Sequence, residues 1–75
     1  MMNEIFEGVV IDPGHGGVDS GAMGNNALEK DYTLLISKYM YDRFRELGVP
    51  VYLTRDSDVT LNPTERVNKV LSFFR

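Results

Sequence analysis

Hydrophobic side chains in the first part of the chain follow two different periods. Residues 8–12 place three aliphatic side chains in a row and lead into Pro-Gly, which predicts a short strand buried on both faces. Between residues 28 and 47, apolar side chains recur at steps of three and four, which predicts an amphipathic helix. Gly48 follows directly, and glycine commonly ends a helix in a left-handed conformation. The pattern therefore predicts a strand, a long loop and a helix.

The rest of the chain repeats the order of strand and helix. Residues 49–54 predict a second strand, which is followed by a polar loop. A second helix is expected to begin with Asn62 as its N-cap, to use Glu65 to complete the cap, and to continue to the end of the chain. Strands and helices in alternation predict an α/β fold with a parallel sheet. Because two strands cannot bury two layers of helix, we expect this chain to be the first half of a domain.

The loop between the first strand and the first helix is the most unusual segment. It runs from Pro13 to about Asn26 and holds five of the seven glycines in the sequence. His15, the only histidine, lies at the carboxyl end of the strand, where open α/β sheets bind ligands. Two interpretations are open for it: a surface side chain without a function, or a ligand or acid–base group. The loop is not a phosphate-binding or dinucleotide-binding glycine motif, because Ala22 stands in place of the required lysine and Asp19 in place of the required glycine.

Glu29, at the start of the predicted helix, also has two interpretations. As a structural residue it would complete a capping box with Asn26. As a functional residue it would lie near His15, and an imidazole and a carboxylate are two of the ligands of a hydrolytic zinc site. The spacing alone favours capping. Other acidic residues are expected to be solvated or to form turns: Asp19, Asp31, Asp56 and Asp58. The tyrosines are expected to pack on helices or strands: Tyr32, Tyr39, Tyr41 and Tyr52.

Composition narrows the possible classes of protein. With 75 residues and no cysteine, the chain has neither disulfides nor thiolate metal sites, and its core is small for independent stability. The net charge of −3 argues against a nucleic-acid partner, because phosphate contacts need clustered Lys and Arg. No apolar run is long enough to span a membrane, and the acidic start differs from a secretory signal. We therefore expect cytoplasmic synthesis without a signal peptide, and no membrane partner.

A series of short segments stands in a specific order along the chain. The segments are Val10-Ile11-Asp12-Pro13-Gly14-His15-Gly16-Gly17, Asp19, Gly21-Ala22, Glu29-Lys30-Asp31, Leu53-Thr54-Arg55-Asp56-Ser57-Asp58 and Glu65-Arg66. In this order they resemble the N-terminal half of the zinc-dependent N-acetylmuramoyl-L-alanine amidases, the amidase type 3 family. The resemblance implies a mostly parallel twisted sheet with helices on both faces, and it implies that His15 and Glu29 bind Zn²⁺. The implied reaction is hydrolysis of the amide between N-acetylmuramic acid and L-alanine in peptidoglycan.

The same resemblance implies that residues 1–75 are the incomplete N-terminal part of one catalytic domain. In the family the third zinc ligand is a later histidine and the general base a later glutamate, so both are expected beyond Arg75 and no catalytic residue is expected in this chain. The isolated chain is then expected to be inactive and to need a complementary C-terminal fragment or the remainder of the domain. The lack of a secretory signal favours an endolysin-like enzyme of a phage, which acts on the cell wall after release. The alternative is a non-catalytic α/β interaction module in which His15 is structural.

Overall fold

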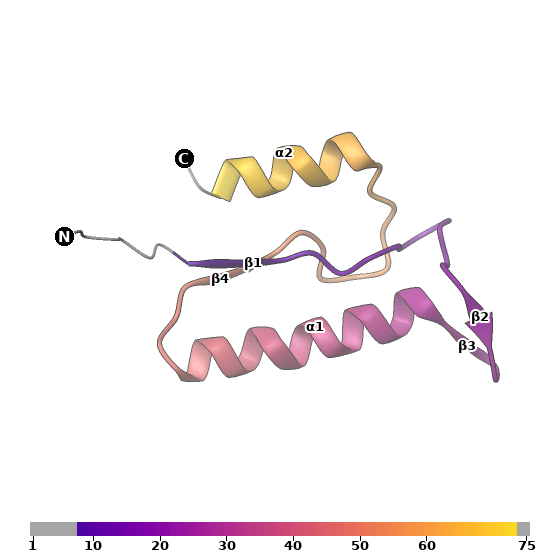
Figure 1. Cartoon of the computed structure of the whole chain (residues 1–75), viewed down its shortest axis with the longest axis horizontal. Coiled ribbons are helices and arrows are strands. Elements are labelled where there is room, and N and C mark those ends of the chain that lie inside the picture. Colours follow the sequence, from indigo (N-terminus) through magenta and orange to yellow (C-terminus); the bar gives the residue numbers. More distant parts are fainter. Residues whose placement is uncertain (1–7, 74–75) are drawn as a thin grey trace.

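A computed structural model describes residues 8–73 and has the predicted order of strands and helices (Figure 1). The elements are β1 (Val9–Ile11), β2 (Met23–Gly24), β3 (Ala27–Leu28), α1 (Glu29–Glu46), β4 (Val51–Leu53) and α2 (Pro63–Phe73). The predicted continuation of α2 to the end of the chain concerns residues 74 and 75, which lie outside the described residues. In the described part, neither helix is long and apolar enough to cross a membrane.

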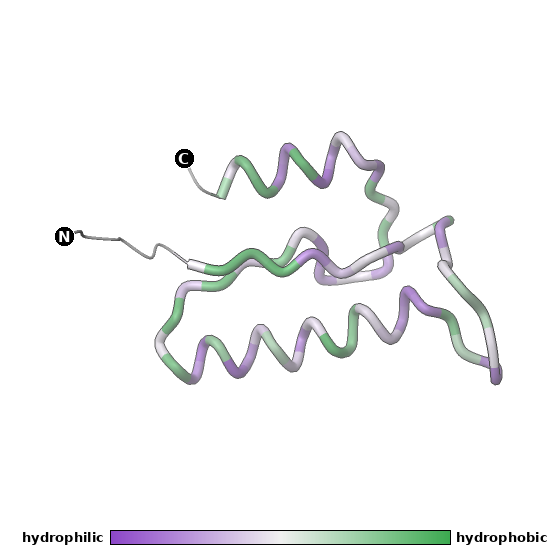
Figure 2. Tube along the Cα trace, in the orientation of Figure 1, coloured by the Kyte–Doolittle hydropathy of each residue, from purple (hydrophilic) through white to green (hydrophobic). Residues whose placement is uncertain are grey.

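The main sheet consists of β1 and β4, which pair in parallel. Val9 lies opposite Val51, Val10 opposite Tyr52, and Ile11 opposite Leu53. The helix α1 connects the two strands, and α1 and α2 lie on opposite sides of them (Figure 1). Hydrophobic residues concentrate along both strands, between the two helices (Figure 2). The predicted α/β architecture, with parallel strands and helices on both faces, is therefore confirmed.

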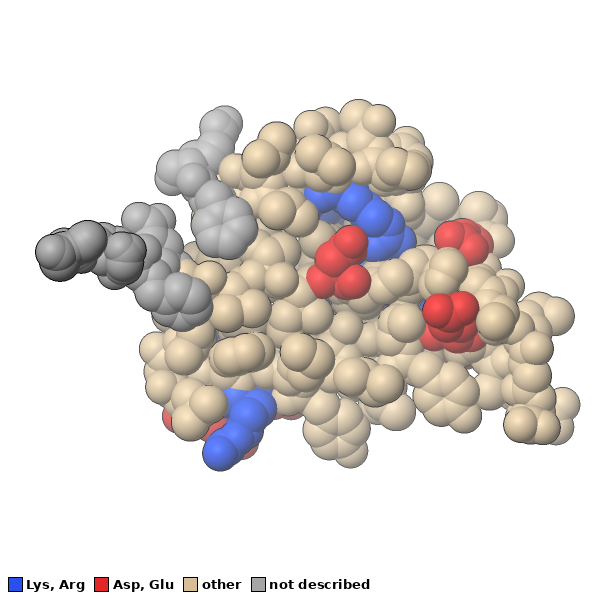
Figure 3. Space-filling view, in the orientation of Figure 1, with Lys and Arg blue, Asp and Glu red and all other residues tan. Residues whose placement is uncertain are grey.

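Charged side chains of both signs are mixed on the surface. On the face drawn in Figure 3, basic side chains close to α2 lie next to acidic ones. Ion pairs join Lys30 to Asp58 at 2.8 Å and Arg43 to Glu46 at 3.0 Å. This face therefore carries neighbouring charges of opposite sign and not a broad field of one sign.

The core between the helices is small. Ile11 and Val51 are the buried hydrophobic side chains among residues 8–73, and each is 8% exposed. Val9 and Val10 are only half-buried. The prediction that the first strand is buried on both faces is therefore wrong for the described residues, because the cover that they provide leaves Val9 and Val10 partly accessible.

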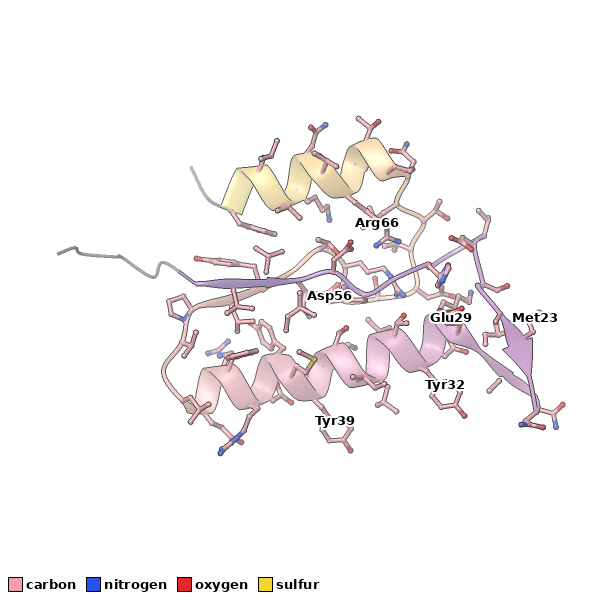
Figure 4. All side chains as sticks on the ribbon, in the orientation of Figure 1. Met23, Glu29, Tyr32, Tyr39, Asp56 and Arg66 are labelled. Carbon is pink, nitrogen blue, oxygen red and sulfur yellow. The ribbon has the colours of Figure 1, made fainter. Side chains whose placement is uncertain are left out.

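The face with which α1 packs on the sheet differs from the apolar stripe in its sequence. Ser37 is the buried residue of α1. The stripe itself is exposed at Tyr32, Leu35, Ile36, Tyr39, Met40 and Leu47. Tyr32 and Tyr39 point away from the sheet (Figure 4), so the prediction that they pack on the protein is wrong. Two strands are too narrow a platform to cover both the face around Ser37 and this stripe.

The other two tyrosines pack as predicted. The ring of Tyr52 in β4 stacks on Phe73 of α2, with ring centroids 4.7 Å apart and planes 12° from parallel. Tyr41 is half-buried, and the guanidinium carbon of Arg45 lies 5.7 Å from the centre of its ring. The Tyr52–Phe73 stack joins α2 to β4, whereas the contact of Arg45 with Tyr41 lies within α1.

The segment predicted as a loop over residues 13–26 contains part of a hairpin, because β2 and β3 pair antiparallel. Its turn consists of Asn25 and Asn26, whose φ angles are 53° and 64°. Two successive left-handed residues are typical of the type I′ turn, which asparagine tolerates well. Asn26 lies in this turn and so does not cap the helix. The N-cap of α1 is Leu28, whose side chain makes no capping hydrogen bond. The predicted capping box of Asn26 with Glu29 is therefore wrong.

The predicted start of α2 is confirmed in detail. The backbone N–H of Glu65 donates to Asn62 Oδ1, and the backbone N–H of Asn62 donates to Glu65 Oε1, both at 2.8 Å. Pro63 occupies the first helical position, where its missing N–H costs no hydrogen bond. The two reciprocal bonds form a capping box that fixes where α2 begins.

This cap gives a quantitative prediction for stability. Asn62→Ala leaves the Glu65 amide without its acceptor and should lower the free energy of unfolding by about 0.5–2 kcal/mol. Asn62→Ser, which can accept the same bond, should stay within a few tenths of a kcal/mol of the original protein. Urea denaturation of both variants measures the difference, and equal midpoints would show that the capping bond does not stabilise α2.

Candidate metal centre

The turn that carries His15 directly follows β1 and has an unusual backbone. His15 has a φ of 63°, and Gly16 and Gly17 have φ of 130° and 57°. A left-handed conformation at a residue other than glycine is uncommon and persists only where the surroundings enforce it. Two backbone bonds close the turn: Gly16 N–H donates to Asp19 O at 2.7 Å, and Asp19 N–H donates to Gly16 O at 3.0 Å. The turn thereby brings the side chain of Asp19 next to the imidazole.

The imidazole of His15 lies between two carboxylates. Its Nδ1 is 3.0 Å from Asp19 Oδ2, and its Nε2 is 3.2 Å from Glu29 Oε2. Each carboxylate only accepts hydrogen bonds, so either ring N–H of His15 can donate in the metal-free protein; in the tautomer with Nδ1–H on Asp19, the neutral imidazole keeps a lone pair at Nε2. The side chains remain accessible, at 32% exposed for His15 and 44% for Glu29. The structure therefore brings the two predicted site residues together, and it adds Asp19, which was expected only to be solvated or to form a turn.

Glu29 is the first residue of α1, and one of its two carboxylate oxygens is already used. Oε1 accepts the backbone N–H of Ala22 at 2.9 Å, while Glu29 N–H donates to Ala22 O at 2.8 Å. These two bonds continue the β2–β3 hairpin by one more pair and hold the carboxylate in place. The remaining oxygen, Oε2, faces His15. In Figure 4, Glu29 lies at the beginning of α1, close to the chain that leaves β1.

The pKa values of the three side chains shift in the directions that these contacts require. The hydrogen bond to Asp19 raises the pKa of His15 above its ordinary 6.5, and the charge of Glu29 adds to this effect. The same hydrogen bond lowers the pKa of Asp19. The pKa of Glu29 is lowered mainly by the N–H of Ala22 and further by His15. Both carboxylates thus stay ionised near neutral pH, and Oε2 of Glu29 is the oxygen that remains available to a cation.

Gly21 is the residue around which the site closes. Its φ is 70°, and a Cβ atom at this position would lie 2.7 Å from His15 Cδ2 and 2.8 Å from Glu29 Oε1. Both contacts are shorter than real Cβ atoms show, so any side chain here would push the imidazole and the carboxylate out of place. In the sequence, the segment Gly21-Ala22 is the signal that could have pointed to this role.

The donor set of His15 and Glu29 fits a zinc ion. One imidazole nitrogen and one carboxylate oxygen are ligands that zinc binds at about 2.0–2.1 Å, and two such atoms on a tetrahedral ion are about 3.3 Å apart. The separation of Nε2 and Oε2 is 3.2 Å. Within residues 8–73, no group of three His, Cys, Asp or Glu side chains is arranged to hold a metal. These residues therefore offer two ligands, and the role of both as metal ligands stays a prediction.

Lys30 and Asp58 stand in the motif segments but had no expected role at the site, and they hold the glycine-rich loop from outside. Lys30 Nζ donates to Gly17 O at 2.9 Å and to Asp58 Oδ2 at 2.8 Å. The other oxygen of Asp58 accepts the N–H of Gly17 at 2.7 Å. Asp58 is exposed, as expected, but it does more than face the solvent, since it ties the loop to the segment after β4. The exposed positions of Asp31 and Asp56 agree with their expected solvation.

The crowding at Gly21 gives a prediction with a matched control. Gly21→Ala should abolish the contact between His15 and Glu29, because the new methyl group overlaps both side chains. Gly48→Ala strains the backbone equally, since Gly48 has a φ of 77°, but it has no heavy atom within 4 Å of the new methyl. Both variants should lose about 1–2 kcal/mol through the left-handed backbone. Only Gly21→Ala should lose the NMR contact between the two side chains, and its persistence there would contradict the geometry.

The Asp19 contact gives a prediction about pH. In the metal-free protein Asp19→Asn should lower the pKa of His15 toward 6.5, because the charged acceptor of the Nδ1–H bond is removed. The folded-state pKa of His15 is raised, so the contact stabilises the metal-free protein fully below pH 6.5, and this stabilisation is lost as pH rises through the folded-state pKa. An NMR titration of the His15 ring protons measures the change. Asp31→Asn, an exposed change in α1, serves as the control and should leave the pKa of His15 unaltered.

Comparison with known proteins places this chain in a family. The N-acetylmuramoyl-L-alanine amidase family matches residues 9–73. The germination-specific N-acetylmuramoyl-L-alanine amidase of Bacillus subtilis is 47% identical over 55 residues, which make up 73% of this chain and 23% of that protein. The fold of this chain resembles that of the N-acetylmuramoyl-L-alanine amidase AmiC2 of Nostoc punctiforme. The TM-score is 0.82 and the identity 45%, over 88% of this chain and 37% of that one.

A second solved structure gives the same result. The catalytic domain of CwlV, an N-acetylmuramoyl-L-alanine amidase from Bacillus (Paenibacillus) polymyxa var. colistinus, matches with a TM-score of 0.84 and 32% identity, over 91% of this chain and 40% of that one. The chain therefore spans less than half the length of each of these relatives. Because the match runs from β1 to α2 and includes both His15 and Glu29, the chain belongs to the N-acetylmuramoyl-L-alanine amidase family.

Proposed function

We propose that this chain is part of a zinc-dependent N-acetylmuramoyl-L-alanine amidase, in which His15 and Glu29 supply two of the zinc ligands. The observation that carries the proposal is the separation of 3.2 Å between His15 Nε2 and Glu29 Oε2, which suits two ligands of one ion. Asp19 supports it, because a carboxylate on Nδ1 leaves Nε2 as the free donor atom, as is usual for histidines that bind metals. Membership of the amidase family supports the substrate and the reaction.

The reaction is hydrolysis of the amide that joins N-acetylmuramic acid to L-alanine in peptidoglycan. Zinc bound at this site would supply Lewis acidity, which polarises a carbonyl and lowers the pKa of water. His15 and Glu29 would hold the metal; Asp19 orients the imidazole through its bond with Nδ1, and the N–H of Ala22 orients the Glu29 carboxylate. The resemblance to the family implies that a later glutamate is the general base that takes the proton of the water.

We further propose that residues 1–75 form the N-terminal part of one catalytic domain and are inactive alone. Two open surfaces support this. The apolar side chains on the outer side of α1, among them Tyr39 at 71% exposed, have no cover in the described part. A hollow of about 490 Å³ runs along β4, lined by Tyr41, Tyr52 and Phe73 among others. A complementary C-terminal segment would cover these surfaces and bring the third zinc ligand. An endolysin-like phage origin and action on the wall after release remain predictions.

The test uses the complete catalytic domain that contains this chain. Elemental analysis should find one zinc per domain, and purified peptidoglycan should release new L-alanine amino groups without new reducing sugar ends. His15→Ala and Glu29→Gln should each lower the rate by more than about 100-fold, since changes next to metal ligands already cost 10–100-fold. Asp31→Asn, which removes an exposed carboxylate two residues after Glu29, is the matched control and should stay close to the unaltered rate.

Two results would overturn the proposal. A complete domain without tightly bound zinc would remove the role of His15 and Glu29 as ligands. Unchanged wall hydrolysis in His15→Ala would favour the non-catalytic interaction module, in which the histidine is structural.

A further inference from the structure

Two arginines from the second half of the chain converge on the backbone of the His15 turn. Arg66 Nη1 donates to Pro13 O at 2.8 Å, and its Nη2 donates to His15 O at 2.6 Å. Arg55 Nη2 donates to Gly14 O at 2.9 Å, and its Nε donates to Pro13 O at 3.3 Å. Three successive carbonyl groups thus point to two guanidinium groups. Figure 4 shows Arg66 reaching from α2 toward the chain that follows β1.

Arg55 connects this turn to the helix that carries Glu29. It is only 3% exposed, although its side chain is charged. The same Nη2 that bonds Gly14 lies 3.1 Å from Lys30 O and 3.2 Å from Thr33 Oγ1, both in the first turns of α1. Thr33 Oγ1 in turn donates to Gly14 O at 2.7 Å. One buried guanidinium therefore fixes the position of the first turn of α1 relative to the His15 turn.

Arg66 acts on the His15 residue itself. Its contact is with the carbonyl of the residue that carries the imidazole and has the left-handed φ of 63°. Its Nη1 also donates to Asp12 Oδ1 at 2.6 Å, and Asp12 Oδ1 accepts the hydroxyl of Thr54 at 2.7 Å. A planar fork of this kind can bond several acceptors at once, whereas a lysine ammonium is a compact point charge without that fixed geometry.

We propose that Arg66 and Arg55 are positioning residues for the metal site: Arg66 holds His15 in its left-handed conformation, and Arg55 sets the distance between the His15 turn and the helix of Glu29. This inference rests on the zinc site proposed above. Neither guanidinium is expected to touch the metal or the substrate. The two arginines keep His15 Nε2 and Glu29 Oε2 facing each other in the metal-free protein. This raises the affinity for the metal, because less reorganisation is needed on binding.

The experiment compares Arg66→Lys with Lys69→Gln in the complete catalytic domain. Lys69 also reaches from α2 to a backbone carbonyl, Thr54 O at 2.8 Å, but it makes no bond to the His15 turn, so it controls for a general loss of packing. Arg66→Lys should weaken zinc binding by about 10–100-fold in competition with a chelator, the range typical of residues that orient ligands. Lys69→Gln should change it by less than about threefold, within the ordinary scatter of surface changes. Thermal unfolding measures stability in parallel.

A second measurement does not depend on the metal. In the metal-free domain, Arg66→Lys should weaken or remove the NMR contact between the His15 ring and the Glu29 side chain, whereas Lys69→Gln should retain it. Arg55→Lys should lose the same NMR contact under conditions in which that variant is folded. The inference is overturned when Arg66→Lys matches the unaltered protein in both measurements, or when the two variants lose zinc affinity and stability in equal measure. A domain that binds no zinc at all would refute the proposed function, and the NMR contact would then decide this inference alone.

Discussion

The parallel pairing of β1 with β4 is the constraint on which the whole site depends. It places Thr54 and Arg55 beside the chain that leaves β1, where Thr54 N–H donates to Ile11 O at 3.0 Å and its hydroxyl donates to Asp12 Oδ1 at 2.7 Å. Thr54 is completely buried, so these bonds are shielded from water. A slip by one residue would turn every β4 side chain to the opposite face and carry Arg55 away from the His15 turn. The geometry of the turn is therefore set by strand pairing as much as by its own glycines.

The strands of this small sheet and the loops at their carboxyl ends are stabilised by different interactions. At the carboxyl ends of the strands, hydrogen bonds from Lys30, Arg55 and Arg66 to backbone carbonyls hold the loops. Along the strands, the buried hydrophobic side chains of the described part are Ile11 and Val51. Burial of apolar surface contributes about 25 cal/mol per Å², so these two side chains add little to the free energy of unfolding. The polar network gives the site one geometry, but it cannot replace a core. The surfaces on α1 and β4 are where more burial could be gained.

The fold could be predicted from periodicity because each main element has a clear pattern and an end signal. The hairpin of β2 and β3 could not, since two-residue strands carry no period, and Asn26, which lies in its turn, also fits the N-cap of a helix that begins near Glu29. The error about α1 has another cause. An apolar stripe shows which face tends to be buried, but the width of the sheet decides which face is buried in this part of the chain. The alternation of strand and helix has no such ambiguity.

The site was predictable in part for a related reason. The meeting of His15 and Glu29 follows from topology, because the end of β1 and the start of α1 lie at one edge of the sheet. The support from Arg55 and Arg66 does not, because backbone carbonyls have no sequence signature and become acceptors only once the turn has formed. The segment 19–22 shows how the two levels combine. Asp19 occupies Nδ1 of the imidazole and Ala22 occupies Oε1 of the carboxylate. Gly21 between them leaves the space in which the two free donor atoms face each other. One short segment thus orients both predicted ligands, which explains why a loop so rich in glycine can still hold a single geometry.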